Sequence, residues 1–265
     1  MIIIAERINS SRKRIAQAIE ERDTAFIQAE ARAQAEAGAD YIDVNAGSFL
    51  KKEVEHLKWL VDTVQESVEV PLCLDSPDPA AIKAVFPHCQ AKPMINSITL
   101  EPERLETLLA LVADNGLPVI ALCQSQSLMA EGVEDKVRLA EELLEKTAAA
   151  GVPDERVFID PLIYPVSTNS GSALATLEAI SRIMAAHQGV HTTCGLSNVS
   201  YGMPHRRLLN RTFLACAITR GLDSAIIDPT DRQLSSVLQA ADLLLGRDDF
   251  GMKYIAAARA GGLAA

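Results

Sequence analysis

The stretch "VEVPLCLDSPDPAAIKAVF", residues 68–86, contains the change of pattern that decides the fold. Within it, Leu72–Asp75 is apolar on both faces until Asp75, which is typical of a strand buried in a parallel sheet. A helix-like run starts a few residues later, and Ser76 or Asp78 is the better candidate to cap it. Asp75 itself is either another cap for this helix or a ligand-binding group, and the remaining strands decide between the two.

The same unit, a short apolar run followed by a longer amphipathic one, recurs along the chain. The predicted strands are Ile2–Ile8, Tyr41–Asn45, Leu72–Asp75, Ala91–Ser97, Pro118–Gln124, Val157–Pro161, Thr192–Asn198 and Ser224–Asp228. The clearest predicted helices are Phe26–Ala37, Glu53–Gln65, Pro102–Asp114, Asp135–Ala149, Ala173–His187, Arg207–Arg220 and Gln233–Leu244. Eight such units in about 250 residues predict one domain over residues 1–265, an α/β fold of the (β/α)₈ TIM-barrel type, rather than an open doubly wound sheet.

Composition and charge exclude several classes of protein. Of the 265 residues, 48% are hydrophobic, which is enough for a large core. There are 25 Lys and Arg against 35 Asp and Glu, and no basic cluster of the kind that binds nucleic acid. No apolar run reaches the roughly 18 residues of a membrane span. The charge order at the N-terminus is the reverse of a secretory signal. We expect a cytoplasmic protein that binds neither nucleic acid nor a membrane.

The five cysteines do not indicate a metal site or a disulfide framework. They form no Cys-x-x-Cys pair, and their odd number is typical of reduced thiols. His88 with Cys89, and His191 with Cys194, are isolated pairs without a second cluster of zinc ligands. We expect no protein-bound metal.

Almost every predicted strand ends on Asp, Asn or Gln, and in a TIM barrel these ends form the active site. One such residue alone is often only a helix cap, but caps alone would include more Ser, Thr and Gly. A carboxylate can accept two parallel hydrogen bonds, and a carboxamide can pair with a ligand edge that has both a donor and an acceptor. The set therefore suits a planar heterocycle with adjacent N–H donors and a carbonyl. The residues are Glu6, Asn9, Asp43, Asn45, Asp75, Asn96, Gln124, Asp160, Ser197, Asn198 and Asp228.

Other chemistries fit these strand ends poorly. A phosphate site needs Gly-rich backbone, Lys or Arg, and Lys92 lies at the wrong end of its strand for a Schiff-base aldolase. The strand ends have no His for a metallohydrolase. The sequence "GLSNV" at 195–199 lacks the second Gly of a nucleophile elbow. Asp75 and Asp160 could pair as in a glycosidase, but aromatic residues for sugar stacking make up only 4% of the chain.

Six motifs together resemble the pterin-binding methyltransferases, which move a methyl group between methyltetrahydrofolate and a corrinoid protein. The resemblance covers essentially the whole chain, and together the motifs are far more specific than any one of them. They are "IIIAERIN" at 2–9, "DVNAG" at 43–47, "LCLDS" at 72–76, "MINSIT" at 94–99, "IDPLI" at 159–163 and "GLSNVSYGMPHRRLLNRTFLA" at 195–215.

The resemblance implies a pterin pocket at the mouth of the barrel. Asn198 would lie close to N5 of tetrahydrofolate or 5-methyltetrahydrofolate and donate a hydrogen bond to it during catalysis. The other pocket residues implied are Asp75, Asn96, Asp160, Asn45, Glu6, Asn9 and Ser197. Three arginines receive no role, because they could meet the glutamate tail, a partner or only solvent: Arg206, Arg207 and Arg211.

The resemblance also implies a partner. Cobalt, as Co(I), would be the nucleophile, so the enzyme needs none of its own. The chain has no residues left for a cobalamin domain, so a separate corrinoid protein would dock over the barrel mouth. Family members are typically homodimers, and the direction of transfer stays open.

Two alternatives remain. A dihydropteroate synthase-like enzyme shares the pterin pocket, but it needs a Lys and an Arg-x-His motif for pyrophosphate, and "IIDPTDR" at 226–232 lacks that motif. A non-catalytic pterin-binding barrel would keep Asp75, Asn96 and Asp160 without any need for Asn198.

Overall fold

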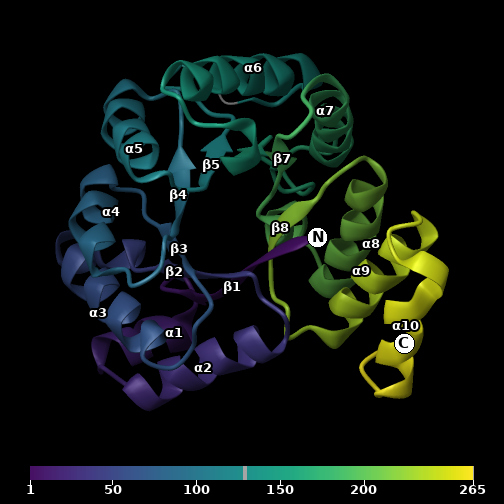
Figure 1. Cartoon of the computed structure of the whole chain (residues 1–265), viewed down its shortest axis with the longest axis horizontal. Coiled ribbons are helices and arrows are strands. Elements are labelled where there is room, and N and C mark those ends of the chain that lie inside the picture. Colours follow the sequence, from purple (N-terminus) through teal and green to yellow (C-terminus); the bar gives the residue numbers. More distant parts are fainter. Residues whose placement is uncertain (128–129, 265) are drawn as a thin grey trace.

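The computed structural model describes residues 1–127 and 130–264, and it shows a ring of parallel strands enclosed by helices (Figure 1). The strands are β1 (Ile2–Asn9), β2 (Tyr41–Asn45), β3 (Leu72–Asp75), β4 (Met94–Ile98), β5 (Val119–Leu122), β6 (Val157–Asp160), β7 (His191–Thr192) and β8 (Ser224–Ile227). Neighbouring strands pair in the order β7-β6-β5-β4-β3-β2-β1-β8, every pair parallel. The predicted TIM barrel is confirmed.

The helices follow the strands around the ring, with additional short elements in the connections. The α-helices are α1 (Lys13–Glu20), α2 (Thr24–Glu36), α3 (Glu53–Gln65), α4 (Pro79–Val85), α5 (Pro102–Asn115), α6 (Val133–Ala149), α7 (Ser172–Ala186), α8 (Arg206–Thr219), α9 (Arg232–Leu244) and α10 (Met252–Arg259). The 3₁₀ helices are η1 (Gly47–Lys52), η2 (Phe86–His88), η3 (Asp154–Arg156), η4 (Leu196–Ser200) and η5 (Asp249–Gly251).

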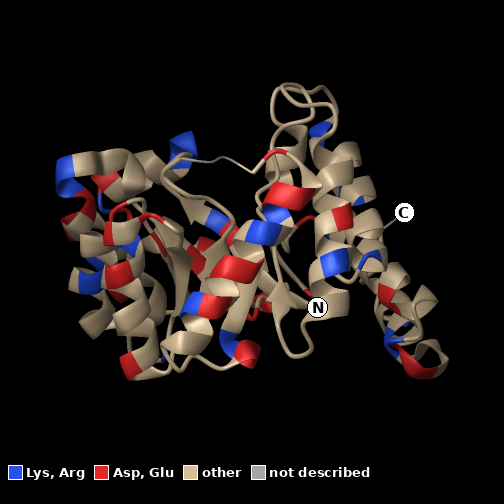
Figure 2. Ribbon diagram, turned by 90° about the horizontal axis from the view of Figure 1, so that it is seen from above, with Lys and Arg blue, Asp and Glu red and all other residues tan. Residues whose placement is uncertain are grey.

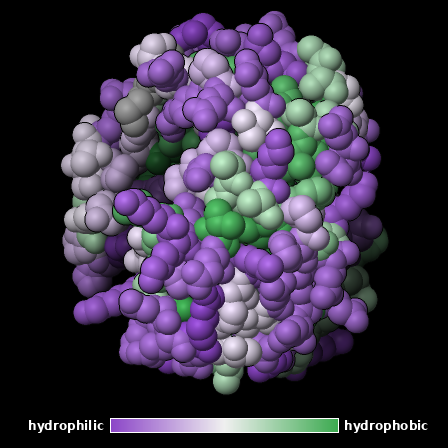
Figure 3. Space-filling model, turned by 90° about the vertical axis from the view of Figure 1, so that its left-hand side faces the viewer, coloured by the Kyte–Doolittle hydropathy of each residue, from purple (hydrophilic) through white to green (hydrophobic). Residues whose placement is uncertain are grey.

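The outer surface carries many charged and polar residues (Figure 2, Figure 3). Charged residues of both signs lie along the surrounding helices (Figure 2), and the face that carries α3 and α4 is mostly hydrophilic (Figure 3). Among the described residues, no helix combines the length and apolar character needed to cross a membrane. Helix α10 lies outside the ring at the C-terminal end (Figure 1) and buries none of its residues.

The barrel closes at its weakest point between β7 and β8. Strand β7 has only two residues, and a single bridge joins Gly195 to Ile226. The Ile226 N–H donates to the Cys194 carbonyl at 3.0 Å. The predicted strand Thr192–Asn198 is therefore wrong beyond Thr192, because the chain leaves the sheet and turns into η4.

The inside of the barrel has an apolar layer that sets the position of the polar residues. Ile4, Cys73, Met94, Ile120 and Phe158 come from five different strands and pack into one buried cluster. Side chains two positions apart on a strand point the same way. The residues two positions after Cys73, Met94 and Phe158 are Asp75, Asn96 and Asp160, which therefore form the next layer toward the mouth.

Helix α4 is capped without the Asp75 carboxylate. Asp78 is the N-cap, and its Oδ1 accepts from the Ala80 N–H at 2.9 Å. The Ser76 hydroxyl accepts from the Asp78 N–H at 3.0 Å. The prediction that Ser76 or Asp78 caps this helix is confirmed, and Asp75 is left for another use.

Candidate active site

A polar layer at the C-terminal strand ends lines a cavity of about 560 Å³. Its polar wall includes residues from β2, β3, β4 and β6, and η4 adds a carboxamide from the opposite side. Its apolar wall includes Ile120, Leu122 and Ile226. We call this space the inner cavity, and its predicted site residues are Asn45, Asp75, Asn96, Asp160 and Asn198.

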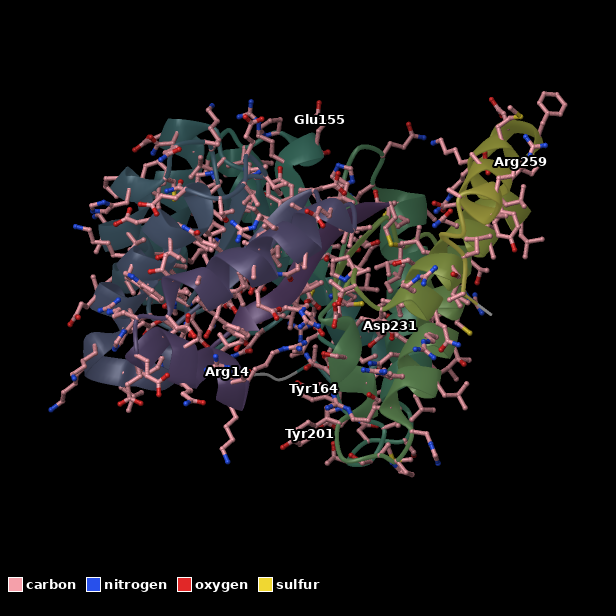
Figure 4. All side chains as sticks on the ribbon, turned by 90° about the horizontal axis from the view of Figure 1, so that it is seen from below. Arg14, Glu155, Tyr164, Tyr201, Asp231 and Arg259 are labelled. Atoms are coloured by element: carbon pink, nitrogen blue, oxygen red, sulfur yellow. The ribbon has the colours of Figure 1, made fainter. Side chains whose placement is uncertain are left out.

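A smaller cavity of about 290 Å³ adjoins the inner cavity and shares Asp75, Asn96 and Asn198 with it. The remaining predicted residues lie here, namely Glu6, Asn9 and Ser197. The structure thus brings all the predicted site residues together around two joined spaces. Residues at this end of the barrel are seen in Figure 4, where Tyr164, Tyr201 and Asp231 lie opposite Glu155.

Asp75 is held by a side chain. The Asn45 Nδ2 donates to the Asp75 Oδ2 at 2.9 Å, while the Asn45 Oδ1 accepts from the Ser10 hydroxyl and the Gly47 N–H. Burial raises the pKa of Asp75 to about 6, although the Asn45 hydrogen bond and the Arg104 charge oppose this rise. At pH 7 the carboxylate form prevails, and Asn45 orients it.

Asp160 is held by the backbone instead. Its carboxylate accepts the N–H of Leu162 at 2.8 Å and also the Gly195 N–H. Burial raises the pKa of Asp160 to about 6, with these two donors working against the rise. Leu162 has a φ of +58°, an unusual conformation for a residue with a side chain. The Lys136 Nζ supports this turn by donating to the carbonyls of Pro161 and Leu162.

Asp43 belonged to the predicted set of strand-end residues but not to the residues implied for the pterin pocket, and the structure places it beside Asp75 and Asn96. Its side chain is buried, and its Oδ1 accepts from the Asn96 Nδ2 at 3.2 Å. Burial, and then the Asp75 charge, raise the pKa of Asp43 well above its usual range. Asp43 lies two residues before Asn45 on the same strand, so the two side chains point to the same face, and this spacing could have placed Asp43 in the implied pocket from the sequence.

Two buried cations were also missed by the sequence analysis. Arg104 of α5 donates to the backbone carbonyls of Ser76, Pro77 and Ser97, which ties together the loops after β3 and β4. Lys136 of α6 is fully buried behind the turn after Asp160, and burial lowers its pKa to about 8. Neither position differs in sequence from an ordinary cation on an amphipathic helix.

The η4 segment is fixed from both sides. The Ser197 hydroxyl donates to Glu6 at 3.0 Å, and Glu6 also pairs with Arg12 at 2.9 Å. Burial raises the pKa of Glu6, while Arg12 and the Ser197 hydrogen bond lower it. Arg206 donates to the Ser197 carbonyl at 2.8 Å and to the Ser200 hydroxyl at 3.1 Å.

Asn198 differs from its neighbours because its carboxamide makes no hydrogen bond with any described residue, and it is exposed. A Cβ at Gly195 would lie 3.0 Å from the Asn198 Nδ2, so glycine leaves room for this side chain. Asn198 lines both joined cavities and also a third one described below. Its N–H groups are therefore available to a ligand.

The three arginines without a predicted role separate into different cases. Arg211 pairs with Asp231 at 2.8 Å, and Asp231 caps α9, so this pair joins two helices. Arg206 is bound to neutral acceptors of η4. Arg207 is exposed and forms no hydrogen bond or ion pair within residues 1–127 and 130–264.

Over the part of the chain that the structure describes, no group of three or more His, Cys, Asp or Glu is arranged to hold a metal ion. The inner cavity instead offers carboxylate acceptors at Asp75 and Asp160, together with carboxamides. Such a set of acceptors and donors matches a heterocycle that has an amino group beside a ring N–H.

This barrel and its acceptor set define a class of enzyme, and the sequence confirms it: residues 5–228 match the pterin-binding enzyme family, to which the chain belongs. The chain is 42% identical over 263 residues to the methylcorrinoid:tetrahydrofolate methyltransferase of Eubacterium limosum, covering 98% of this chain and 97% of that one. It is 32% identical over 240 residues to the methionine synthase of Mycobacterium tuberculosis, covering 86% of this chain but 20% of that longer protein.

Solved structures with the same fold are more distant in sequence. A dihydropteroate synthase from Xanthomonas albilineans superimposes with a TM-score of 0.70 at 18% identity, covering 94% of this chain and 93% of that one. The dihydropteroate synthase of Thermus thermophilus gives a TM-score of 0.67 at 20% identity, covering 90% and 93%. These likenesses show the fold alone.

Proposed function

We propose that this protein is a methyltransferase that moves a methyl group between N5 of tetrahydrofolate and the cobalt of a corrinoid on a separate protein. The observation that carries the proposal is the unpartnered carboxamide of Asn198, placed where the acceptor-lined inner cavity opens outward. The similarity to the Eubacterium limosum methyltransferase over nearly the full length of both chains supports it.

The inner cavity suits a pterin ring. Asp75 and Asp160, both ionised at neutral pH, accept hydrogen bonds from the amino and ring N–H groups. The Asn96 Nδ2 is engaged by Asp43, so its Oδ1 is left as a further acceptor. Asn45 uses its carboxamide on Asp75, Ser10 and Gly47, so it positions a ligand-binding carboxylate rather than the ligand.

The difficulty of the reaction is that N5 is a poor leaving group. As the N5–CH₃ bond breaks, the bonding electron pair returns to N5, and a hydrogen bond to that atom strengthens in the transition state. Asn198 supplies such a donor, and in the reverse direction it stabilises the same transition state. The corrinoid, when its carrier protein docks at the mouth, supplies the cobalt that exchanges the methyl group.

The direct test is Asn198→Ala. Methyl transfer should fall by about 10²–10³-fold, the usual cost of one transition-state donor, while the affinity for tetrahydrofolate changes little. Turnover can be followed from the absorbance of free cob(I)alamin, and affinity by calorimetry. Gly195→Ala is a second probe: its φ of −69° suits alanine, but the new methyl group displaces the carboxamide. Full turnover in both variants would remove Asn198 from the mechanism.

The dihydropteroate synthase alternative is disfavoured by the end of β8. The sequence "IIDPTDR" at 226–232 lacks the Arg-x-His motif that would bind the pyrophosphate there, and Arg7 of the neighbouring β1 is already engaged by Glu30 at 2.7 Å and by Asp228 at 3.1 Å. An assay with aminobenzoate and pterin pyrophosphate should give no product. A non-catalytic pterin-binding barrel predicts tight tetrahydrofolate binding without any methyl transfer to cob(I)alamin.

We also infer a single-domain, cytoplasmic homodimer that contains no metal of its own. Exposed apolar side chains at the C-terminal end support self-association, among them Leu244, Phe250 and Met252. Sedimentation velocity should give twice the mass of one chain, and Phe250→Ser should shift the protein toward the monomer. Elemental analysis of the purified protein should find no stoichiometric metal.

A further inference from the structure

A third cavity, of about 750 Å³, continues outward from the inner cavity. It shares Asn198 with the inner cavity, and it shares Glu6, Ser11, Arg12 and Ser197 with the smaller adjoining one. We call it the outer groove. The start of α8 forms its other wall, with Arg206, Arg207 and Asn210.

The outer groove has two cations whose charge is not matched by an acid of the groove. Each of its three acids has its own partner: Glu6 pairs with Arg12, Asp228 with Arg7, and Asp231 with Arg211. The two remaining cations are those at the start of α8. The guanidinium of one binds neutral oxygens, and the other has no partner among the described residues; they are Arg206 and Arg207.

The opposite exit of the inner cavity has the reverse character. A cavity of about 630 Å³ shares Pro77, Glu101 and Arg104 with the inner cavity. It is lined by Asp78, Glu101 and Glu103, and its one cation, Arg104, donates to three backbone carbonyls. An anionic group leaving the inner cavity is therefore attracted toward α8 and repelled on the other side.

We propose that the outer groove binds the glutamate carboxylates of the folate tail, with Arg207 as their ion-pair partner. This proposal rests on the proposed function, which places the pterin ring in the inner cavity. Tyr201, a residue that is 66% exposed and whose ring centre lies 5.7 Å from the Arg206 guanidinium carbon, offers an apolar surface to the aminobenzoyl group. Since the whole chain has a formal charge of −10, a polyglutamate tail needs such a local basic site.

The test compares two ligands and two variants without any corrinoid protein present. Tetrahydrofolate carries the tail, whereas 6-methyltetrahydropterin has only the ring. Arg207→Gln should weaken tetrahydrofolate about 3- to 10-fold, as expected for one charge-assisted contact at a partly exposed site, and leave the tail-less pterin unchanged. The matched control is Arg220→Gln, because Arg220 is exposed at the other end of α8. The same Arg207→Gln variant should weaken the binding of tetrahydrofolate triglutamate more than that of the monoglutamate.

Several results would overturn the proposal. Equal affinities of Arg207→Gln and Arg220→Gln for tetrahydrofolate would do so, as would an equal loss for both ligands. If Arg207→Gln keeps folate affinity but slows transfer to a corrinoid protein, the groove serves the partner instead. If wild-type protein binds neither ligand, the proposed function itself fails, so the two failures are distinguishable.

Discussion

The two carboxylates that face the inner cavity, Asp75 and Asp160, look equivalent in sequence but are built into the molecule differently. Both end a strand, and burial raises the pKa of each to about 6. Asp75 receives a hydrogen bond from the Asn45 side chain, whereas Asp160 receives two from backbone N–H groups. Asp160 therefore holds the local chain in place as well as lining the inner cavity, whereas the Asp75 carboxylate binds no backbone N–H group among the described residues.

The largest effect expected from this comparison is on ligand affinity. Asp75→Asn removes a charged acceptor and should weaken tetrahydrofolate about 10- to 100-fold, since hydrogen bonds to charged groups contribute about 1.5–3 kcal/mol. Asp160→Asn should weaken tetrahydrofolate binding by a similar factor. Calorimetric titration of both variants checks this, and Asp135→Asn, a partly exposed site on α6 that lines none of the described cavities, is the control. If Asp75→Asn binds tetrahydrofolate as tightly as the wild-type protein does, the Asp75 carboxylate does not bind the ligand.

The second effect is an opposite response of affinity and stability to pH. Both folded-state pKa values, about 6, lie above the unfolded value of about 3.9 for Asp. Between pH 4 and 6 the folded protein thus binds more protons, so the free energy of unfolding of the ligand-free protein falls as pH rises. Affinity should instead rise, by roughly tenfold for each carboxylate between pH 5 and 7. Urea unfolding and calorimetry measure the two responses, and Asp75→Asn should flatten both.

The smallest effect expected separates the two acids by stability. Asp160→Ala leaves two backbone N–H groups without their acceptor and releases the turn at Leu162, so unfolding should become easier by about 1–3 kcal/mol. Asp75→Ala should change the free energy of unfolding by less than about 1 kcal/mol, because only one side-chain donor at a cavity wall loses its partner. Urea denaturation at pH 7 compares them. A larger decrease in the free energy of unfolding for Asp75→Ala than for Asp160→Ala would contradict this prediction.

Much of the fold could be predicted because the spacing of apolar residues and the residues typical of turns indicate the same element boundaries. Strands β2 and β3 begin and end where the sequence predicts. The prediction for β4 was three residues too early, because the strand begins only after Pro93. For β7 the prediction was wrong beyond Thr192. A short run of mixed residues does not distinguish a strand from a 3₁₀ turn, and Gly195 allows the chain to leave the sheet.

The candidate site was predictable as a set of strand ends but not in its hydrogen bonding. Alternation explains why Asp75, Asn96 and Asp160 point into the barrel. The roles of Asp43 and Lys136 depend on contacts between elements that are distant in sequence, such as the hydrogen bond from Asn96 on β4 to Asp43 on β2, with β3 between them. Local patterns carry no information about which partner a buried polar group will find.

The closure of the barrel has a mechanical consequence. Strands β1 to β6 are joined by parallel ladders, with register shifts in the β1–β2 and β4–β5 pairs, whereas the described residues between β7 and β8 are joined by one bridge, from Gly195 to Ile226. Asp75 and Asn96 lie on strands that pair with a neighbour on each side, whereas Asn198 lies three residues after the bridge at Gly195. If a corrinoid protein docks at the mouth as proposed, we expect its contact to shift Asn198 more readily than Asp75 and Asp160.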